Sequence, residues 1–192
     1  MIREIDTPRG TARVLLQQAL DPKGAILLGH GAGGSVSAPD LQVATRVALE
    51  EEFTVALVEQ PYRVAGRKSA PPPGHLDEAW IAVVEQLALG LPLITGGRSS
   101  GARVACRTAA SVGAVGVLCL AFPLQPPGRA DRMDELEAVQ VPVLVVQGRN
   151  DQFGVPPDGP NRRVVVLEGD HGLKKDPAGL GEAVRSWLRE LA

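Results

Sequence analysis

The segment 97–101 (GRSSG) places a serine where it could act as a nucleophile. Ser99 has a glycine two residues away on each side, between an apolar run and a helix-compatible run. A G-x-S-x-G sequence in that context turns sharply from strand to helix, and the glycines are needed because side chains at both flanks would collide. The turn raises the hydroxyl above the sheet edge and points the Ser100 amide at the same place. The pattern therefore predicts covalent chemistry through Ser99.

A serine hydroxyl at neutral pH needs a base to accept its proton and an acid to orient that base. His171, just after the last predicted strand, is the expected base, and Asp151, after an earlier apolar run, is the expected acid. Asp170 is the weaker alternative acid because the side chains of consecutive residues usually diverge. A loop histidine and a polar turn would explain these residues without catalysis, but the order Ser99, Asp151, His171 and the strand-end positions favour a catalytic triad.

The glycine-rich run GHGAGG follows a short apolar strand and predicts an oxyanion hole. A tetrahedral intermediate needs two amide donors, and loss of one typically costs ~3 kcal/mol of transition-state stabilisation. The Ser100 N–H is one expected donor and the Ala32 N–H is the other, with Gly31 or Gly33 as alternatives. The run lacks the Gly-Lys-Ser/Thr ending of a Walker loop, so nucleotide binding is disfavoured.

Two predicted loops, residues 62–75 and 122–132, are expected to form the sides of a shallow and open substrate pocket. Gly31, Tyr62 and Phe122 are expected to line it, together with Arg98 beside the nucleophile. The loops also carry other cations, namely Arg63, Arg67 and Lys68 in residues 62–75 and Arg129 and Arg132 in residues 122–132. A carboxylate- or phosphate-bearing acyl substrate would suit these charges, but solvated charges or salt-bridge partners are the favoured interpretation.

The elements that must position these residues alternate along the chain. Strands are predicted at 11–19, 25–28, 53–58, 93–95, 114–121, 142–146 and 163–167, and helices at 37–52, 77–89, 99–111, 133–139 and 178–191. This alternation predicts one α/β domain over residues 1–192, with about seven strands in a mostly parallel sheet, the first antiparallel, and helices on both faces. Ser37 and Asp40 are expected to begin the first helix as a capping box. Ligand chemistry gathers at the carboxyl ends of such strands, where each candidate residue falls.

The composition excludes several classes of function. The net charge is −2 and charged residues make up 22%, which gives no electrostatic case for binding nucleic acid or an anionic membrane surface. The longest apolar run, 112–123, is too short to span a bilayer, and the first residues lack the apolar segment of a secretory signal. Cys106 and Cys119 are expected to be buried thiols, which favours a cytoplasmic protein. An exposed apolar stripe, which would indicate an oligomer, is identifiable only in a structure, so the sequence leaves the oligomeric state open.

On these motifs the chain resembles the α/β-hydrolase superfamily, in particular its compact, lidless, dienelactone-hydrolase-like branch. The matching pieces are residues 30–34, residues 97–101, Asp151 and residues 169–172, within a resemblance that covers residues 11–191. It implies an α/β-hydrolase fold without a cap domain and a serine hydrolase that cleaves ester-type bonds in a small-molecule acyl substrate, with no cofactor or metal. A dienelactone hydrolase proper uses a cysteine nucleophile, and neither cysteine lies at the turn, so that activity is not implied.

Two other functions are compatible with the same pattern. The first is a catalytically weak or inactive scaffold that keeps the fold without turnover, because fold does not dictate function. The second is a cofactor-free haloperoxidase or perhydrolase, which uses the same triad with a different pocket. The intact nucleophile, base, acid and glycine loop favour the hydrolase, since a protein freed from catalysis has no reason to keep a strained serine turn.

Overall fold

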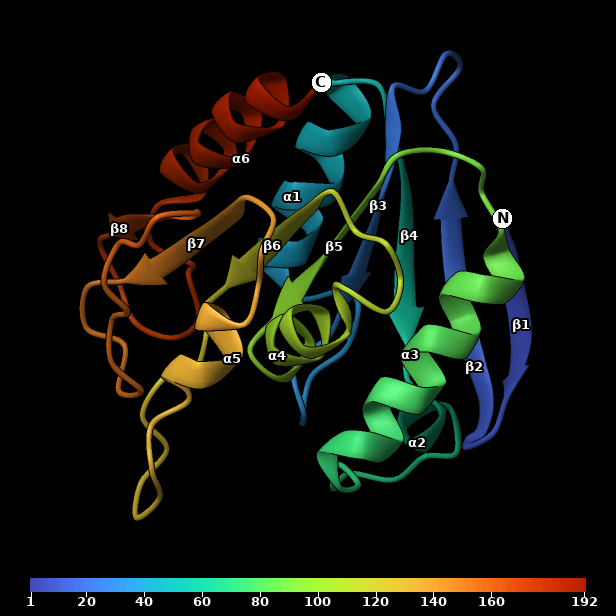
Figure 1. Ribbon diagram of the computed structural model, residues 1–192, viewed down its shortest axis with the longest axis horizontal. Coiled ribbons are helices and arrows are strands. Elements are labelled where there is room, and N and C mark those ends of the chain that lie inside the picture. The colour runs from blue at the N-terminus through green and yellow to red at the C-terminus, as the bar shows by residue number, and fades with distance from the viewer.

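The computed structural model describes residues 1–192 and contains one eight-stranded sheet (Figure 1). The strands are β1 Ile2–Thr7, β2 Gly10–Gln17, β3 Gly24–Gly29, β4 Phe53–Glu59, β5 Leu93–Arg98, β6 Gly116–Leu120, β7 Val143–Gly148 and β8 Arg162–Leu167, in the spatial order β1-β2-β4-β3-β5-β6-β7-β8. All neighbours from β4 to β8 are parallel, whereas β2 is antiparallel to both β1 and β4. The expected mostly parallel sheet is confirmed.

Helices cover both faces of this sheet (Figure 1). They are α1 Pro39–Glu50, α2 Pro61–Val64, α3 Pro73–Leu87, α4 Ser100–Thr108, α5 Met133–Glu137 and α6 Pro177–Leu191. The apolar residues of α1 and α6 pack together against one face, and those of α3, α4 and α5 pack against the other. Every residue of β3, β6 and β7 is buried, which explains why these strands are continuous apolar runs in the sequence. None of the helices has both the length and the apolar character needed to cross a bilayer.

The count of about seven strands falls one short, because β1 has little apolar character. Its sequence IREIDT contains three charged residues, and only Ile5 is buried. The strand lies at the edge of the sheet and forms a hairpin with β2, in which Thr7 pairs with Gly10. Gly10 has a φ of +107°, a conformation that glycine adopts readily. Pairing of the backbone with β2, rather than an apolar pattern, makes this segment a strand.

The expected capping box at the start of α1 is wrong. The helix begins at Pro39 after Ala38, which makes no side-chain capping bond. Ser37 instead shares a hydrogen bond of 2.7 Å with the Ser35 hydroxyl. The Asp40 side chain is fully buried, and one of its oxygens lies 2.8 Å from the Arg98 Nε. Asp40 therefore faces the end of β5.

Two further differences from the expected elements lie between β4 and α3. The helix α3 begins at Pro73, four residues before the expected start, because proline is well suited to the first turn of a helix. The expected loop from Tyr62 to His75 also contains the short helix α2. Both changes shorten the irregular chain beside the predicted site.

Candidate active site

Ser99 lies between the last residue of β5 and the first residue of α4. Its backbone has φ 52° and ψ −109°, in a region that non-glycine residues rarely occupy. Its amide donates to the Leu120 carbonyl at 2.9 Å, and its carbonyl accepts from the Arg103 amide at 3.2 Å. Bonds to β6 and to α4 thus hold the strained residue in place. Backbone strain of this kind costs about 1–3 kcal/mol and persists only where the surroundings fix it.

The glycines that flank Ser99 allow the β5–α4 turn to press against β3. A Cβ atom at Gly97 would lie 2.4 Å from the Gly29 carbonyl oxygen, and one at Gly101 would lie 2.3 Å from the same oxygen. Real Cβ atoms do not approach a backbone oxygen so closely. The spacing of the GRSSG segment therefore reflects close packing of three backbone segments around a single carbonyl group.

A chain of hydrogen bonds joins three of the predicted residues. The His171 Nε2 lies 3.0 Å from the Ser99 Oγ, and the His171 Nδ1 lies 2.8 Å from the Asp151 Oδ2. An ionised carboxylate only accepts, so Nδ1 carries the proton and Nε2 is free to accept the proton of the Ser99 hydroxyl. The Asp151 carboxylate is fully buried, and the His171 side chain is 18% exposed. A nucleophile, a base and an orienting acid are arranged in this way in serine hydrolases.

The Asp151 carboxylate has further partners that sequence reasoning missed. The side-chain amide of the buried Gln147, in β7, donates to the Asp151 Oδ2 at 2.8 Å. The Phe153 amide donates to the Asp151 Oδ1 at 2.9 Å, and the Phe153 ring meets the His171 ring edge-on at a centroid distance of 4.7 Å. A lone polar residue at the end of an apolar strand is the signal that could have identified Gln147. Asp170, the alternative acid, accepts instead from the Gly172 amide.

Two hydrogen bonds to the Gly31 carbonyl hold the glycine loop after β3. The Gly31 carbonyl is 2.8 Å from the His30 Nδ1 and also accepts from the Gly34 amide at 3.0 Å. In a trans peptide the N–H points away from the preceding C=O, so these two bonds fix the direction of the Ala32 N–H. The Ala32 and Ser100 amides donate to no acceptor in the protein. Both are thus available to bind an oxyanion, and their role as an oxyanion hole stays a prediction.

His30 holds this loop only in its neutral form. Its Nδ1–H donates to Gly31, and its Nε2 accepts from the Gln60 amide at 3.0 Å. Burial lowers the pKa of His30, although the bond to Gly31 opposes this shift. A proton on Nε2 would break the bond from Gln60.

The lowered pKa of His30 predicts a loss of stability in mild acid. In the unfolded chain the pKa of histidine is ~6.5, so His30 stabilises the fold fully above that pH and progressively less as the pH falls toward its lower folded pKa. Urea unfolding from pH 8 to pH 5 should show this decline. The variant His30→Gln, whose side-chain oxygen can accept from Gln60, should show a shallower one. The variant His75→Gln is the control, since His75 is partly exposed. Equal declines in the wild type and His30→Gln would contradict the assignment.

The four residues expected to line the substrate pocket have different surroundings. Gly31 lies against the nucleophile, because a Cβ at this position would be 3.6 Å from the Ser99 Cβ. Tyr62 is buried and donates from its hydroxyl to the Ala32 carbonyl at 2.6 Å, so it supports the glycine loop. Phe122 is completely buried in the core between α4, α5 and the sheet, so its ring does not face a substrate. Arg98 forms an ion pair with Asp40.

Several of the cations near the site are also engaged by the protein. Arg63 donates to the Arg67 carbonyl at 3.2 Å, and Arg132 donates to the Pro123 carbonyl at 2.9 Å. These contacts agree with the favoured interpretation of the loop charges as structural.

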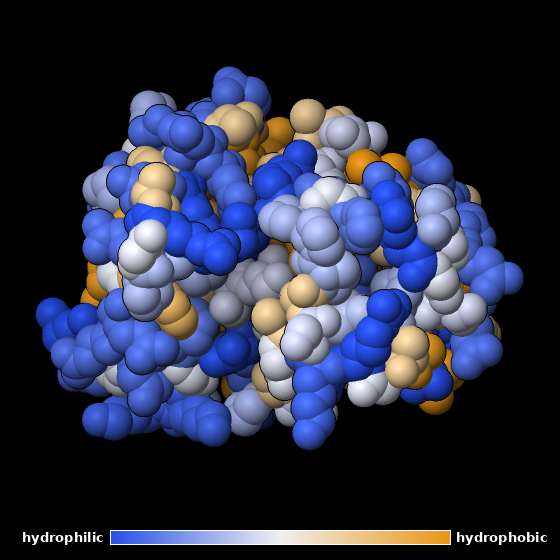
Figure 2. Space-filling model, turned by 90° about the horizontal axis from the view of Figure 1, so that it is seen from below, coloured by the Kyte–Doolittle hydropathy of each residue, from blue (hydrophilic) through white to orange (hydrophobic).

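The carboxyl ends of β3, β4 and β5 point downward in Figure 1, and Figure 2 shows the molecule from that side. This face is mostly hydrophilic and has a hollow near its centre.

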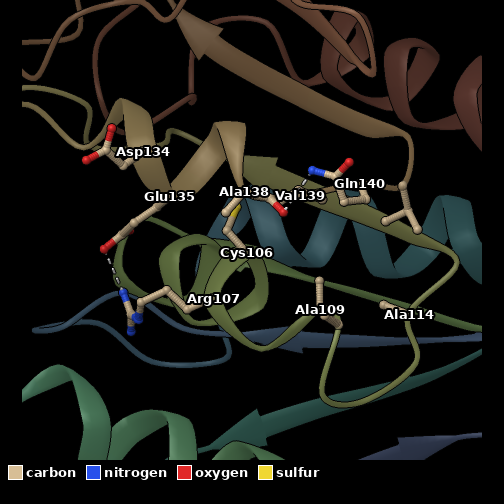
Figure 3. Close-up of a pocket in the computed structure, with 11 residues that line it drawn as sticks. Cys106, Arg107, Ala109, Ala114, Asp134, Glu135, Ala138, Val139 and Gln140 are labelled. Atoms are coloured by element: carbon tan, nitrogen blue, oxygen red, sulfur yellow. Dashed lines mark hydrogen bonds and ion pairs between the residues drawn. The ribbon is translucent and has the colours of Figure 1, made fainter.

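A separate pocket of about 400 Å³ lies between α4 and α5 (Figure 3). Alanine and valine side chains form most of its lining, together with Cys106, and no triad residue contributes to it.

Cys106 and Cys119 are buried free thiols, as expected, with their sulfur atoms 3.5 Å apart. No group of three or more His, Cys, Asp or Glu side chains is arranged to hold a metal ion.

Comparison with known proteins identifies the family and the fold of the chain. Residues 22–178 match the family model described as an alpha/beta hydrolase domain. No curated protein sequence matches the chain. An a/b serine hydrolase without lid from Xanthomonas campestris superposes with a TM-score of 0.80 at 22% identity, over 99% of this chain and 94% of that one.

Two other solved structures share the fold at lower identity. Est1E from Butyrivibrio proteoclasticus has a TM-score of 0.82 at 15% identity, covering 99% of this chain and 98% of its own. A dienelactone hydrolase from Anabaena variabilis has a TM-score of 0.75 at 16% identity, covering 100% of this chain and 95% of its own. Structural similarity at this level of identity establishes the fold and leaves the function to the site.

Proposed function

Because the chain belongs to the alpha/beta hydrolase domain family, we propose that it is a serine hydrolase that cleaves ester-type bonds, as a carboxylesterase or acyl hydrolase. The observation that carries this proposal is the hydrogen-bond chain from Ser99 through His171 to Asp151, at 3.0 Å and 2.8 Å. A small-molecule acyl compound is the proposed substrate. The two free cysteines support localisation of the protein in a reducing compartment such as the cytoplasm.

In the proposed acylation step, the Ser99 oxygen attacks the carbonyl carbon of the ester while His171 Nε2 accepts the hydroxyl proton. The negative charge that develops on the carbonyl oxygen is bound by the Ser100 and Ala32 amides. Asp151 stabilises the imidazolium and keeps the ring in the required tautomer. The carbon–oxygen bond to the alcohol then breaks, and His171 gives its proton to the leaving alcohol. The product of this step is an acyl ester of Ser99.

Deacylation repeats these steps with water as the nucleophile. His171 removes a proton from the water, which attacks the acyl carbon, and the same two amides bind the second oxyanion. The Ser99 oxygen then leaves and takes the proton back from His171. The buried Asp151, held by Gln147 and the Phe153 amide, needs no reorganisation during either step.

Labelling with a fluorophosphonate probe tests this proposal. The probe phosphonylates a serine only when a base activates the hydroxyl, so the wild-type protein should be labelled and the modified residue should be Ser99. The variant Ser99→Ala should show no labelling. The variant Ser100→Ala is a matched control, because it keeps the backbone amide and removes a neighbouring hydroxyl, and it should still be labelled.

Either of two results would contradict the proposal. Labelling that persists in Ser99→Ala would place the nucleophile elsewhere. A folded wild type that is neither labelled nor active on short p-nitrophenyl esters would instead support a scaffold that keeps the fold without turnover. A panel of esters, thioesters and amides would then define the substrate class of an active protein.

A further inference from the structure

The side chain of Arg98 connects three segments around the proposed nucleophile. Its Nε lies 2.8 Å from the Asp40 Oδ2 in the first turn of α1, and its Nη2 donates to the His171 carbonyl at 2.8 Å. Its Nη1 lies beside the glycine loop, 3.3 Å from where a Cβ at Gly31 would stand. Arg98 is also the residue that immediately precedes Ser99. One guanidinium group thus contacts the segments that supply the base and the oxyanion hole.

The surroundings of Arg98 fix its position firmly. The Asp40 side chain is 0% exposed, and its other oxygen accepts from the Leu41 amide at 2.9 Å. The side chain of Arg98 is itself only 19% exposed. Burial raises the pKa of the Asp40 carboxyl, and the positive charge of Arg98 opposes that rise. A guanidinium group held by a buried carboxylate is a rigid donor for a third group.

The loop whose backbone accepts a hydrogen bond from Arg98 carries the proposed base, His171. His171 lies in the loop between β8 and α6, and the nearby Leu173 has a φ of 48°, an unfavourable value for a leucine. The bonds of the imidazole ring to Ser99 and Asp151 orient the ring, whereas the bond from Arg98 holds the backbone that bears it. Without that bond, the ring could keep its contact with Asp151 while the distance from Nε2 to Ser99 varied.

We propose that Arg98 is a positioning residue, which uses its ion pair with Asp40 to hold the backbone of His171 at the distance where the imidazole can accept the Ser99 proton. This inference rests on the proposed hydrolase function and deepens it. It also differs from the expectation that Arg98 lines a pocket and attracts an anionic substrate. Arg98 then acts on the rate of the chemical step and not on the charge preference of the site.

The choice of arginine follows from the geometry. A planar guanidinium offers several N–H groups in fixed directions, so it can bind a carboxylate with one edge and a carbonyl with another. A lysine at this position would keep the positive charge beside Asp40 but could not span both acceptors. The variant Arg98→Lys therefore removes the contact with His171 while leaving the buried carboxylate paired.

The test measures the rate of fluorophosphonate labelling, the kcat and KM for p-nitrophenyl acetate, and the melting temperature. Arg98→Lys should label about 10- to 100-fold more slowly than the wild type. Its kcat should fall by a similar factor, while KM and the melting temperature change little. The double variant Asp40→Asn/Arg98→Met removes both charges together and should show the same loss. If Arg98→Lys does not fold, the double variant tests the positioning role of Arg98 in its place.

A matched control comes from α4. Arg107 has the same exposed fraction of 19% and forms an ion pair with Asp77, but it does not contact the triad. Arg107→Lys should label at the wild-type rate.

Three outcomes would overturn the inference. They are wild-type labelling by a folded Arg98→Lys, wild-type labelling by the double variant, and an equal loss in Arg107→Lys. A KM that rises for an anionic ester while kcat stays constant would instead assign Arg98 to substrate binding. Absence of labelling in the wild type is a different failure, since it removes the proposed function itself.

Discussion

The variant His171→Ala should lose ester hydrolysis by about 10⁴-fold or more, because removal of the base leaves the Ser99 hydroxyl without an acceptor for its proton. The loss should appear in kcat, since the imidazole takes no part in holding the substrate. His171 lies in the loop between β8 and α6 and outside the apolar core, so the fold should persist. The measurement is steady-state hydrolysis of p-nitrophenyl acetate, with circular dichroism to confirm folding.

His75 provides the control for this experiment. It lies in the first turn of α3 and is partly exposed, so His75→Ala should hydrolyse the ester at the wild-type rate. The double variant Ser99→Ala/His171→Ala should be no less active than either single variant, because residues that act as one unit have strongly non-additive effects. A His171→Ala protein that retained a tenth of the wild-type kcat would show that another group activates Ser99.

The variant Gly101→Ala should be the most destabilising single-methyl change in the site. The added Cβ would lie 2.3 Å from the Gly29 carbonyl oxygen and 3.0 Å from the His30 carbonyl oxygen. Both atoms belong to the backbone, so relief requires that α4 move away from β3. We expect a loss of about 3 kcal/mol in the free energy of unfolding, at the upper end for an overpacked position. Urea unfolding followed by circular dichroism measures it.

Gly74 is the matched position for this change. It lies in the first turn of α3, and a Cβ there would have no atom within 4 Å. Gly74→Ala should therefore be neutral or slightly stabilising, since alanine favours a helix more than glycine does. If Gly101→Ala unfolded at the same urea concentration as Gly74→Ala, the close approach between α4 and β3 would be wrong.

The parts of the site that sequence reasoning identified are those that local chemistry requires. Ser99 is marked by glycines that a sharp turn needs, and His171 and Asp151 each follow an apolar run that becomes a strand. Parallel strands bring their carboxyl ends to one edge, so three residues far apart in the chain could be expected to converge. The structure brings them within hydrogen-bonding distance of one another.

The parts that were missed depend on contacts between distant segments. The pairing of Asp40 with Arg98 is one case, because a serine three residues before an acidic residue also fits a helix cap. Gln147 is another, since its role follows from the direction of its amide within a buried strand. The edge strand β1 forms by backbone pairing and shows almost no apolar pattern. Such contacts are fixed only when the fold is complete.

The absence of a cap over the strand ends bears on what can accept the acyl group. No connection between neighbouring elements contains a domain of its own, and the face in Figure 2 is largely hydrophilic. Enzymes that pass an acyl group to another alcohol or to an amine must keep water out while the intermediate waits. An acyl-Ser99 on this face would always meet bulk solvent, the most abundant competing acceptor. If the proposed function holds, this open face favours cleavage of the acyl intermediate by water over its transfer to another acceptor.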